Sequence, residues 1–103
     1  MSLLLSPVNL AKLSLNNRVV MPPMCMYEVH EKDGEITPFH MAHYGARAIG
    51  KVGLIIIEAT AVTPDGRLTD QDLGLWNDTQ AQKLQELVDS LHFLGSKVGI
   101  QLN

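Results

Sequence analysis

The sequence predicts an α/β fold built on a parallel sheet, and two observations support this prediction. Predicted elements alternate along the chain as strand, helix, strand, helix and strand. Residues 52–62 form an almost continuous apolar run, which is typical of a strand in a parallel sheet that helices cover. No glycine-rich dinucleotide fingerprint follows the first strand. Periodicity alone leaves two arrangements open, a doubly wound sheet and the first units of an eight-stranded barrel.

The N-terminal part predicts a small hairpin followed by the first strand of the sheet. Residues 6–17 alternate loosely between apolar and polar side chains, and residues 18–21 form a short run with β-branched residues at its centre. Pro22 and Pro23 lack main-chain N–H donors, so sheet pairing is expected to stop there. Residues 24–27 then supply two thioethers, the only thiol of the chain and a phenol. This composition suits either core packing or the wall of a pocket.

A polar loop over residues 28–36 leads to a predicted helix that Thr37 caps and Gly50 ends. The side of this helix predicted to be apolar consists of Phe39, Ala42, Ala46 and Ile49. The strand over residues 52–62 follows. Glu58 stands near the end of that strand, where a carboxylate must find donors or stay near solvent.

A turn over residues 63–67 and a longer connection lead to a second helix over residues 77–94, whose N-cap is Asn77. Its predicted buried stripe consists of Ala81, Leu84, Leu87, Val88, Leu91 and Leu94. The connection carries Asp70 and Asp72, but no third ligand stands at a metal-binding spacing, so loop capping or an ion pair with Arg67 is the preferred interpretation. Residues 97–102 form the third strand.

The carboxyl ends of three adjacent parallel strands lie together, and ligands of α/β proteins bind at that edge. The residues predicted to meet there are Met24, Cys25, Glu58, Ala59 and Gln101. A primary amide both donates and accepts hydrogen bonds, so the side chain of Gln101 suits a heterocycle that carries alternating carbonyl and imide groups. A flavin has such an edge.

Composition excludes several classes of protein. The chain has 103 residues, 46% of them hydrophobic, so it holds at most one ordinary domain. A formal charge of −3 argues against nucleic acid or an anionic membrane as the main partner. A single cysteine allows no internal disulfide, and the sequence has neither a signal-peptide pattern nor an apolar run long enough to span a membrane. We therefore expect a cytoplasmic protein.

The segment from Asn17 to Tyr27, Asn-Arg-Val-Val-Met-Pro-Pro-Met-Cys-Met-Tyr, closely resembles the first barrel strand of the Old Yellow Enzyme family, in its thiol-containing bacterial branch of NADPH-dependent flavin ene-reductases. Three later segments, over residues 37–44, 53–61 and 99–103, resemble the first helix, second strand and third strand of that family. The resemblance covers essentially all 103 residues. It implies a β-hairpin and the first two and a half units of a (β/α)8 TIM barrel, so residues 1–103 would be an incomplete domain.

The resemblance also implies a cofactor, a reaction and a set of site residues. FMN would be reduced by NADPH and would pass hydride to the β-carbon of a small-molecule enone or enal. The residues implied to contact FMN are Pro22, Pro23, Met24, Cys25, Ala59 and Gln101. Tyr27 would bind the substrate, and Tyr27 and Cys25 would take part in catalysis. No metal is implied.

Other parts of the family site fall beyond Asn103: the substrate-gripping histidines, an arginine beside the flavin and the phosphate-binding loops. His40 and His43 do not replace them, because helix histidines without further ligands are usually capping or packing groups. Two hypotheses follow. The chain is the N-terminal part of an enzyme whose barrel is completed by the same or another chain, or it is a barrel fragment without activity of its own. Unpaired sheet edges further predict a homo-oligomer.

Overall fold

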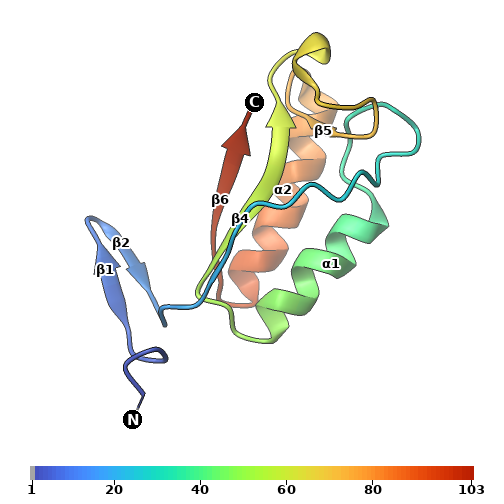
Figure 1. Cartoon of the computed structure of the whole chain (residues 1–103). Helices are drawn as coiled ribbons and strands as arrows, with labels where there is room; N and C mark the ends of the chain where they lie inside the picture. Colours follow the sequence, from blue (N-terminus) through green and yellow to red (C-terminus); the bar gives the residue numbers. More distant parts are fainter. Residues whose placement is uncertain (1) are drawn as a thin grey trace.

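The computed structural model describes residues 2–103, which form a parallel sheet with two helices on one side and a separate N-terminal hairpin (Figure 1). In chain order the elements are β1 (Val8–Leu10), β2 (Leu13–Leu15), β3 (Val20–Met21), α1 (Pro38–Ile49), β4 (Leu54–Ala61), the 3-10 helix η1 (Pro64–Gly66), β5 (Leu73–Gly74), α2 (Asp78–Phe93) and β6 (Lys97–Leu102). The predicted order of strands and helices is confirmed. Among the described residues, no helix combines the length and apolar character needed to cross a membrane.

Strand β4 is the centre of the sheet, and its neighbours β3, β5 and β6 all run parallel to it. Thr60 of β4 pairs with Leu73 of β5 and with Leu102 of β6, so β5 and β6 lie on opposite edges of β4. The predicted first strand over residues 18–21 is shorter than expected, because only Val20 and Met21 pair with β4. Pairing ends where Pro22 and Pro23 remove the donors, and the chain then leaves the sheet.

The N-terminal hairpin is confirmed, with β1 and β2 antiparallel and Val8 paired with Leu15. Its turn lies at Ala11, where φ is +53°. Figure 1 shows the hairpin standing beyond the end of the sheet at which β3, β4 and β6 begin. It is therefore remote from the carboxyl ends of the strands.

Helix α1 begins after Thr37 as predicted, but the predicted apolar face is wrong. Ala42, Ala46 and Ile49 are exposed and Phe39 is half-buried. The buried residues of the helix are His40, Tyr44, Gly45 and Ala48. The two polar rings point toward the sheet because β4 carries a buried carboxylate there, so hydrophobicity is a poor guide to this helix.

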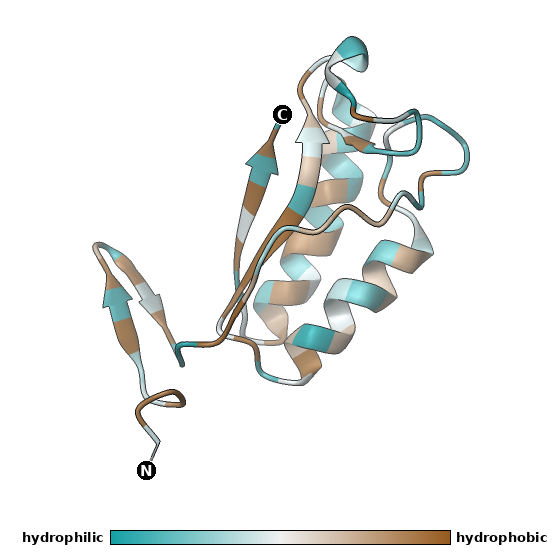
Figure 2. Cartoon of the chain, viewed as in Figure 1, coloured by the Kyte–Doolittle hydropathy of each residue, from teal (hydrophilic) through white to brown (hydrophobic). Residues whose placement is uncertain are grey.

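Helix α2 supplies most of the apolar packing against the sheet. Leu87 and Leu91 are fully buried with Ile55 and Ile57 of β4, and Leu84, Val88 and Leu94 pack around them. Figure 2 shows brown, hydrophobic segments on β4 and along α2. The predicted stripe is thus confirmed except at Ala81, which is exposed. Gly95 closes the helix with a φ of +99°, which favours glycine.

Two short elements in the connection before α2 were not predicted. The 3-10 helix η1 forms at Pro64–Gly66, and β5 pairs with the end of β4. Asp72 caps this connection by accepting from the main-chain N–H groups of Leu68 and Thr69. Loop capping, one of the two alternatives, is thus confirmed at Asp72, whereas the carboxylate of Asp70 pairs with Lys32 and not with Arg67, at 3.3 Å from Nζ.

Candidate functional site

An irregularity in β4 decides which side chains reach the candidate site. Ile57 pairs with Ile100, but the next pair joins Thr60 to Leu102. Two residues of β4, Glu58 and Ala59, therefore lie opposite the single residue Gln101 of β6. Such a bulge bends the strand and redirects the side chains beside it. The backbone register thus places Ala59 beside Gln101, at the carboxyl end of the sheet.

The thiol of Cys25 also lies at the carboxyl end of the sheet. It lies against the main chain of Ala59 and the side chain of Tyr27. Burial raises the pKa of the Cys25 thiol above its ordinary value, and the negative charges of Asp72 and Glu58 act in the same direction. A raised pKa keeps the sulfur protonated at neutral pH, so it is a polarisable contact and a weak donor.

The segment that leaves β3 has alternating exposure. Pro22, Met24 and Tyr27 are exposed, whereas Pro23 and Cys25 are half-buried. Tyr27 has a left-handed backbone, with φ at +56°, which is unusual for a residue with a bulky side chain. Tyr27 is 46% exposed, so the ring is free to meet a molecule bound at this edge. Gln101 is likewise exposed.

Glu58 departs from the predicted arrangement, because its side chain contacts α1 behind the site. The hydroxyl of Tyr44 donates to Oε2 of Glu58 at 2.6 Å and accepts from the Glu58 main-chain N–H at 3.0 Å. Oε1 accepts from the main-chain N–H of Met26 at 3.3 Å. Glu58 is 1% exposed, and both Tyr44 and His40 are fully buried. These residues form one buried network between β4, α1 and the segment after β3.

Opposing effects act on the pKa of Glu58. Burial alone would raise it, but the contacts with His40 and Tyr44 outweigh burial and hold the pKa below its ordinary value. Nε2 of His40 lies 3.6 Å from Oε1, longer than a hydrogen bond, so its contribution is electrostatic. Burial raises the pKa of Tyr44, and the hydrogen bond that its hydroxyl donates to Glu58 adds to that effect. Glu58 is therefore a buried carboxylate, and Tyr44 keeps its proton.

Sequence reasoning missed this network, although it singled out two of its members. Glu58 was expected at the carboxyl end of the sheet, where a ligand would bind, and His40 was interpreted as a capping or packing residue. His40 contacts the helix start, since its Nδ1 accepts from the main-chain N–H of Thr37 at 3.0 Å. His43 stacks on Phe39 with 5.2 Å between ring centroids, and burial lowers its pKa. Within residues 2–103, no cluster of three or more His, Cys, Asp or Glu side chains is arranged to hold a metal ion.

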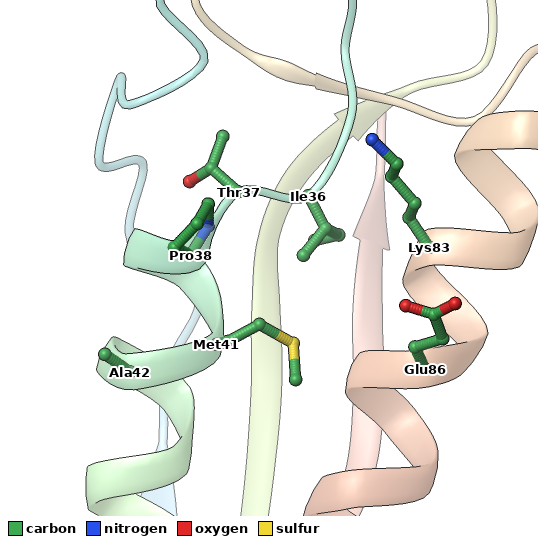
Figure 3. Close-up of a pocket in the computed structure, with 7 residues that line it drawn as sticks. All are labelled: Ile36, Thr37, Pro38, Met41, Ala42, Lys83 and Glu86. Carbon is green, nitrogen blue, oxygen red and sulfur yellow. The ribbon is translucent and has the colours of Figure 1, made fainter.

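A groove lies elsewhere, between the two helices on the far side of the sheet from Gln101. This groove of about 590 Å³ is lined by Ile36, Thr37, Pro38, Met41, Ala42, Lys83 and Glu86. Figure 3 shows Met41 and Ile36 over the sheet, with Lys83 and Glu86 along the α2 side. Lys83 is ion-paired with Glu35, which raises the pKa of the lysine. None of the predicted site residues lines the groove.

Two bacterial NADPH dehydrogenases are similar to this chain over almost all of its residues. The chain is 58% identical over 99 residues to the NADPH dehydrogenase of Bacillus subtilis and 57% identical over 102 residues to that of Listeria monocytogenes. These matches cover 96% and 99% of the chain but only 29% and 30% of the relatives, so the chain spans less than a third of their length.

Solved structures agree with these sequence matches. Morphinone reductase superposes with a TM-score of 0.87 at 34% identity over 96% of the chain and 25% of that protein. The Old Yellow Enzyme from a Pichia species gives a TM-score of 0.89 at 30% identity over 97% of the chain and 26% of that protein. The elements of this chain are therefore the hairpin and the first two and a half units of a (β/α)8 barrel, which it does not close by itself. The model of the NADH:flavin oxidoreductase / NADH oxidase family, whose cofactor is FMN, matches residues 3–103, and the chain belongs to that family.

Proposed function

We propose that residues 1–103 are the N-terminal part of an FMN-dependent NADPH oxidoreductase that reduces the C=C bond of α,β-unsaturated carbonyl compounds. The observation that carries this proposal is the bulge in β4, which sets Ala59 opposite Gln101 at the carboxyl end of the sheet. Cys25 lies against the same Ala59. A small residue, an exposed amide and a protonated thiol thus surround one edge, on the side of the sheet that α1 and α2 leave open.

The donor set at this edge fits FMN. The exposed amide of Gln101 both donates and accepts, as the pyrimidine edge of an isoalloxazine requires. Ala59 has a side chain small enough to leave room for a flat ring. The residues proposed to hold FMN are Pro22, Pro23, Met24, Cys25, Ala59 and Gln101.

The cofactor supplies the hydride chemistry between NADPH and the alkene, and the protein supplies orientation. The phenol of Tyr27 is exposed beside Cys25, so we assign it the task of orienting the carbonyl group of an enone or enal. Cys25 stays protonated and adjusts the reduction potential of the flavin through its contact with the ring. Under this proposal both are catalytic residues, and neither forms a covalent bond with the substrate.

Residues 1–103 form an incomplete domain in this proposal, and the remaining units close the barrel. Within residues 2–103, β3 and β6 each pair on one edge only, which predicts association, including a homo-oligomer of the isolated chain. By itself the chain then lacks activity. A single thiol and a moderate negative charge fit a cytoplasmic protein.

A chimaera tests this proposal directly. Residues 1–103 would be joined to the remaining part of the Bacillus subtilis relative, giving a product called here the completed barrel. We expect it to bind FMN and to oxidise NADPH with cyclohexenone but not with cyclohexanone, which lacks the C=C bond. Residues 1–103 alone should show neither flavin binding nor turnover. A completed barrel that folds without FMN, or that binds FMN and leaves cyclohexenone unreduced, would contradict the proposal.

A further inference from the structure

The buried carboxylate of Glu58 lies directly behind the segment that carries Cys25 and Tyr27. Its Oε1 accepts from the main-chain N–H of Met26, the residue between them. Among the described residues, no other main-chain N–H from Met24 to Glu28 donates a hydrogen bond. This segment has lost its sheet partner, and it is attached to β4 by this main-chain hydrogen bond to Glu58 and by the contact of the Cys25 thiol with Ala59.

The backbone next to that contact is strained. Tyr27 follows Met26 with φ at +56°, a conformation that a residue with a large side chain keeps only when its surroundings impose it. The hydrogen bond from the Met26 main-chain N–H to Glu58 fixes the backbone one residue before Tyr27. Releasing it frees the peptide bond between Cys25 and Met26, which lies one residue before Tyr27.

The carboxylate is itself fixed from the other side. The hydroxyl of Tyr44 holds Oε2 at 2.6 Å, and the bulge places Glu58 so that it reaches α1 while Ala59 stays beside Gln101. Nδ1 of His40 accepts from the Thr37 N–H, so the ring hydrogen lies on Nε2, which is 3.6 Å from Oε1 of Glu58. One oxygen is thus held by a phenol, and the other is left for Met26.

We propose that Glu58 is a positioning residue for the reaction. Through the Met26 N–H it holds Cys25 and Tyr27 at the edge where FMN and the substrate are proposed to bind. Tyr44 of α1 holds the carboxylate in turn. This inference rests on the proposed function, because it needs a reaction at that edge, but it concerns residues that lie behind the site and touch neither cofactor nor substrate.

Two substitutions of Glu58 separate positioning from charge. Glu58→Gln keeps an oxygen that accepts from Met26 and removes the charge, whereas Glu58→Leu removes both. In the completed barrel we expect Glu58→Leu to slow the reoxidation of reduced flavin by cyclohexenone about tenfold to 100-fold, the scale of a small misplacement of a catalytic group. Glu58→Gln should stay near the unmodified rate. Equal slowing by the two variants, or no slowing by Glu58→Leu, would overturn the inference.

A double-mutant comparison tests whether the effect passes through Tyr27. In a Tyr27→Ala background, Glu58→Leu should cause little further slowing, because the positioned ring is gone. Slowing of the same size in both backgrounds would mean that Glu58 acts through general stability, and would overturn the inference. Ser96→Ala is the matched control: Ser96 is also buried and donates to the carbonyl of Val52, at the opposite end of the sheet. It should lower stability and leave flavin reoxidation unchanged.

A milder variant covers the case in which Glu58→Leu does not fold. Tyr44→Phe removes the hydroxyl that fixes Oε2 but leaves the carboxylate in place. We expect a smaller slowing, again absent in the Tyr27→Ala background, and equal slowing in both backgrounds would overturn the inference. An unmodified completed barrel that binds no FMN refutes the proposed function. If that barrel shows normal turnover, and if the Glu58 variants only lower stability and leave flavin reoxidation unchanged, as Ser96→Ala does, then only the role of Glu58 is refuted.

Discussion

Removing one hydroxyl from the buried network should cost the protein much of its stability. Tyr44→Phe deletes the oxygen that donates to Oε2 of Glu58 at 2.6 Å and accepts from the Glu58 main-chain N–H at 3.0 Å. A hydrogen bond to a charged group contributes about 1.5–3 kcal/mol, and a buried N–H left unpaired costs about 1–3 kcal/mol. The free energy of unfolding of the completed barrel should therefore fall by about 2.5–6 kcal/mol at pH 7.

The pH dependence of this loss has a definite sign. The pKa of Glu58 in the folded protein lies below its ordinary value of 4.5, so its ionised form contributes stability that is fully present above pH 4.5 and is lost as pH falls through the folded pKa. Tyr44→Phe removes one of the donors that lower this pKa. The difference in stability between the two proteins should thus be largest at neutral pH and should narrow below pH 4.5.

Urea denaturation of the completed barrel at pH 7 and pH 4, followed by circular dichroism, measures both effects. Tyr27→Phe is the matched control, because it removes a hydroxyl from an exposed ring and should change stability by less than about 0.5 kcal/mol. A loss below about 1 kcal/mol for Tyr44→Phe would refute the argument, because one hydrogen bond alone should contribute more than that. A loss that does not change with pH would show that Glu58 is not ionised in the folded protein.

The remaining predictions concern the site itself. Gln101→Leu should weaken FMN binding about fivefold to 150-fold in a fluorescence titration, from about 1–3 kcal/mol of lost hydrogen bonding, and an unchanged affinity would return Gln101 to an ordinary strand residue. Tyr27→Phe should slow reoxidation of reduced flavin by an enone in stopped flow while FMN stays bound; an equal rate would make the ring only a wall of the pocket. Cys25→Ala should keep FMN and measurable turnover but shift the flavin reduction potential, and loss of all turnover with FMN bound would instead favour covalent or acid–base chemistry at sulfur. Residues 1–103 alone should sediment as oligomers, because the sheet edges are free, and a compact monomer would contradict this expectation.

Much of the fold follows from local signals in the sequence. The proline after Thr37 and the run Lys97–Leu102 mark elements that the structure contains with the same bounds. The apolar run of β4 and the spacing of leucines in α2 were equally informative, because both elements bury aliphatic side chains. Neither the hydrophobic pattern nor the turn residues indicate β5, which consists of two residues and forms only because the first strand ends early.

The buried face of α1 could not be read from hydrophobicity. His40 and Tyr44 are buried because Glu58 offers them a carboxylate, and that contact depends on the bulge in β4. A bulge adds one residue to a strand and leaves no mark in an apolar run. The meeting of Cys25, Ala59 and Gln101 was predictable from parallel topology, whereas the turning of Glu58 toward α1 needed the three-dimensional register.

The central claim is that FMN lies against Ala59 at the carboxyl end of the sheet, and an FMN titration of completed barrels with altered side chains at this position tests it most directly. Ala59→Phe would fill the space proposed for the ring, while Ala59→Ser keeps a small side chain and Ala46→Phe places the same bulk on the exposed side of α1. We predict that Ala59→Phe raises the FMN dissociation constant more than about tenfold, with Ala59→Ser and Ala46→Phe close to the unmodified protein. A folded Ala59→Phe protein that binds FMN as tightly as the unmodified one would contradict the claim.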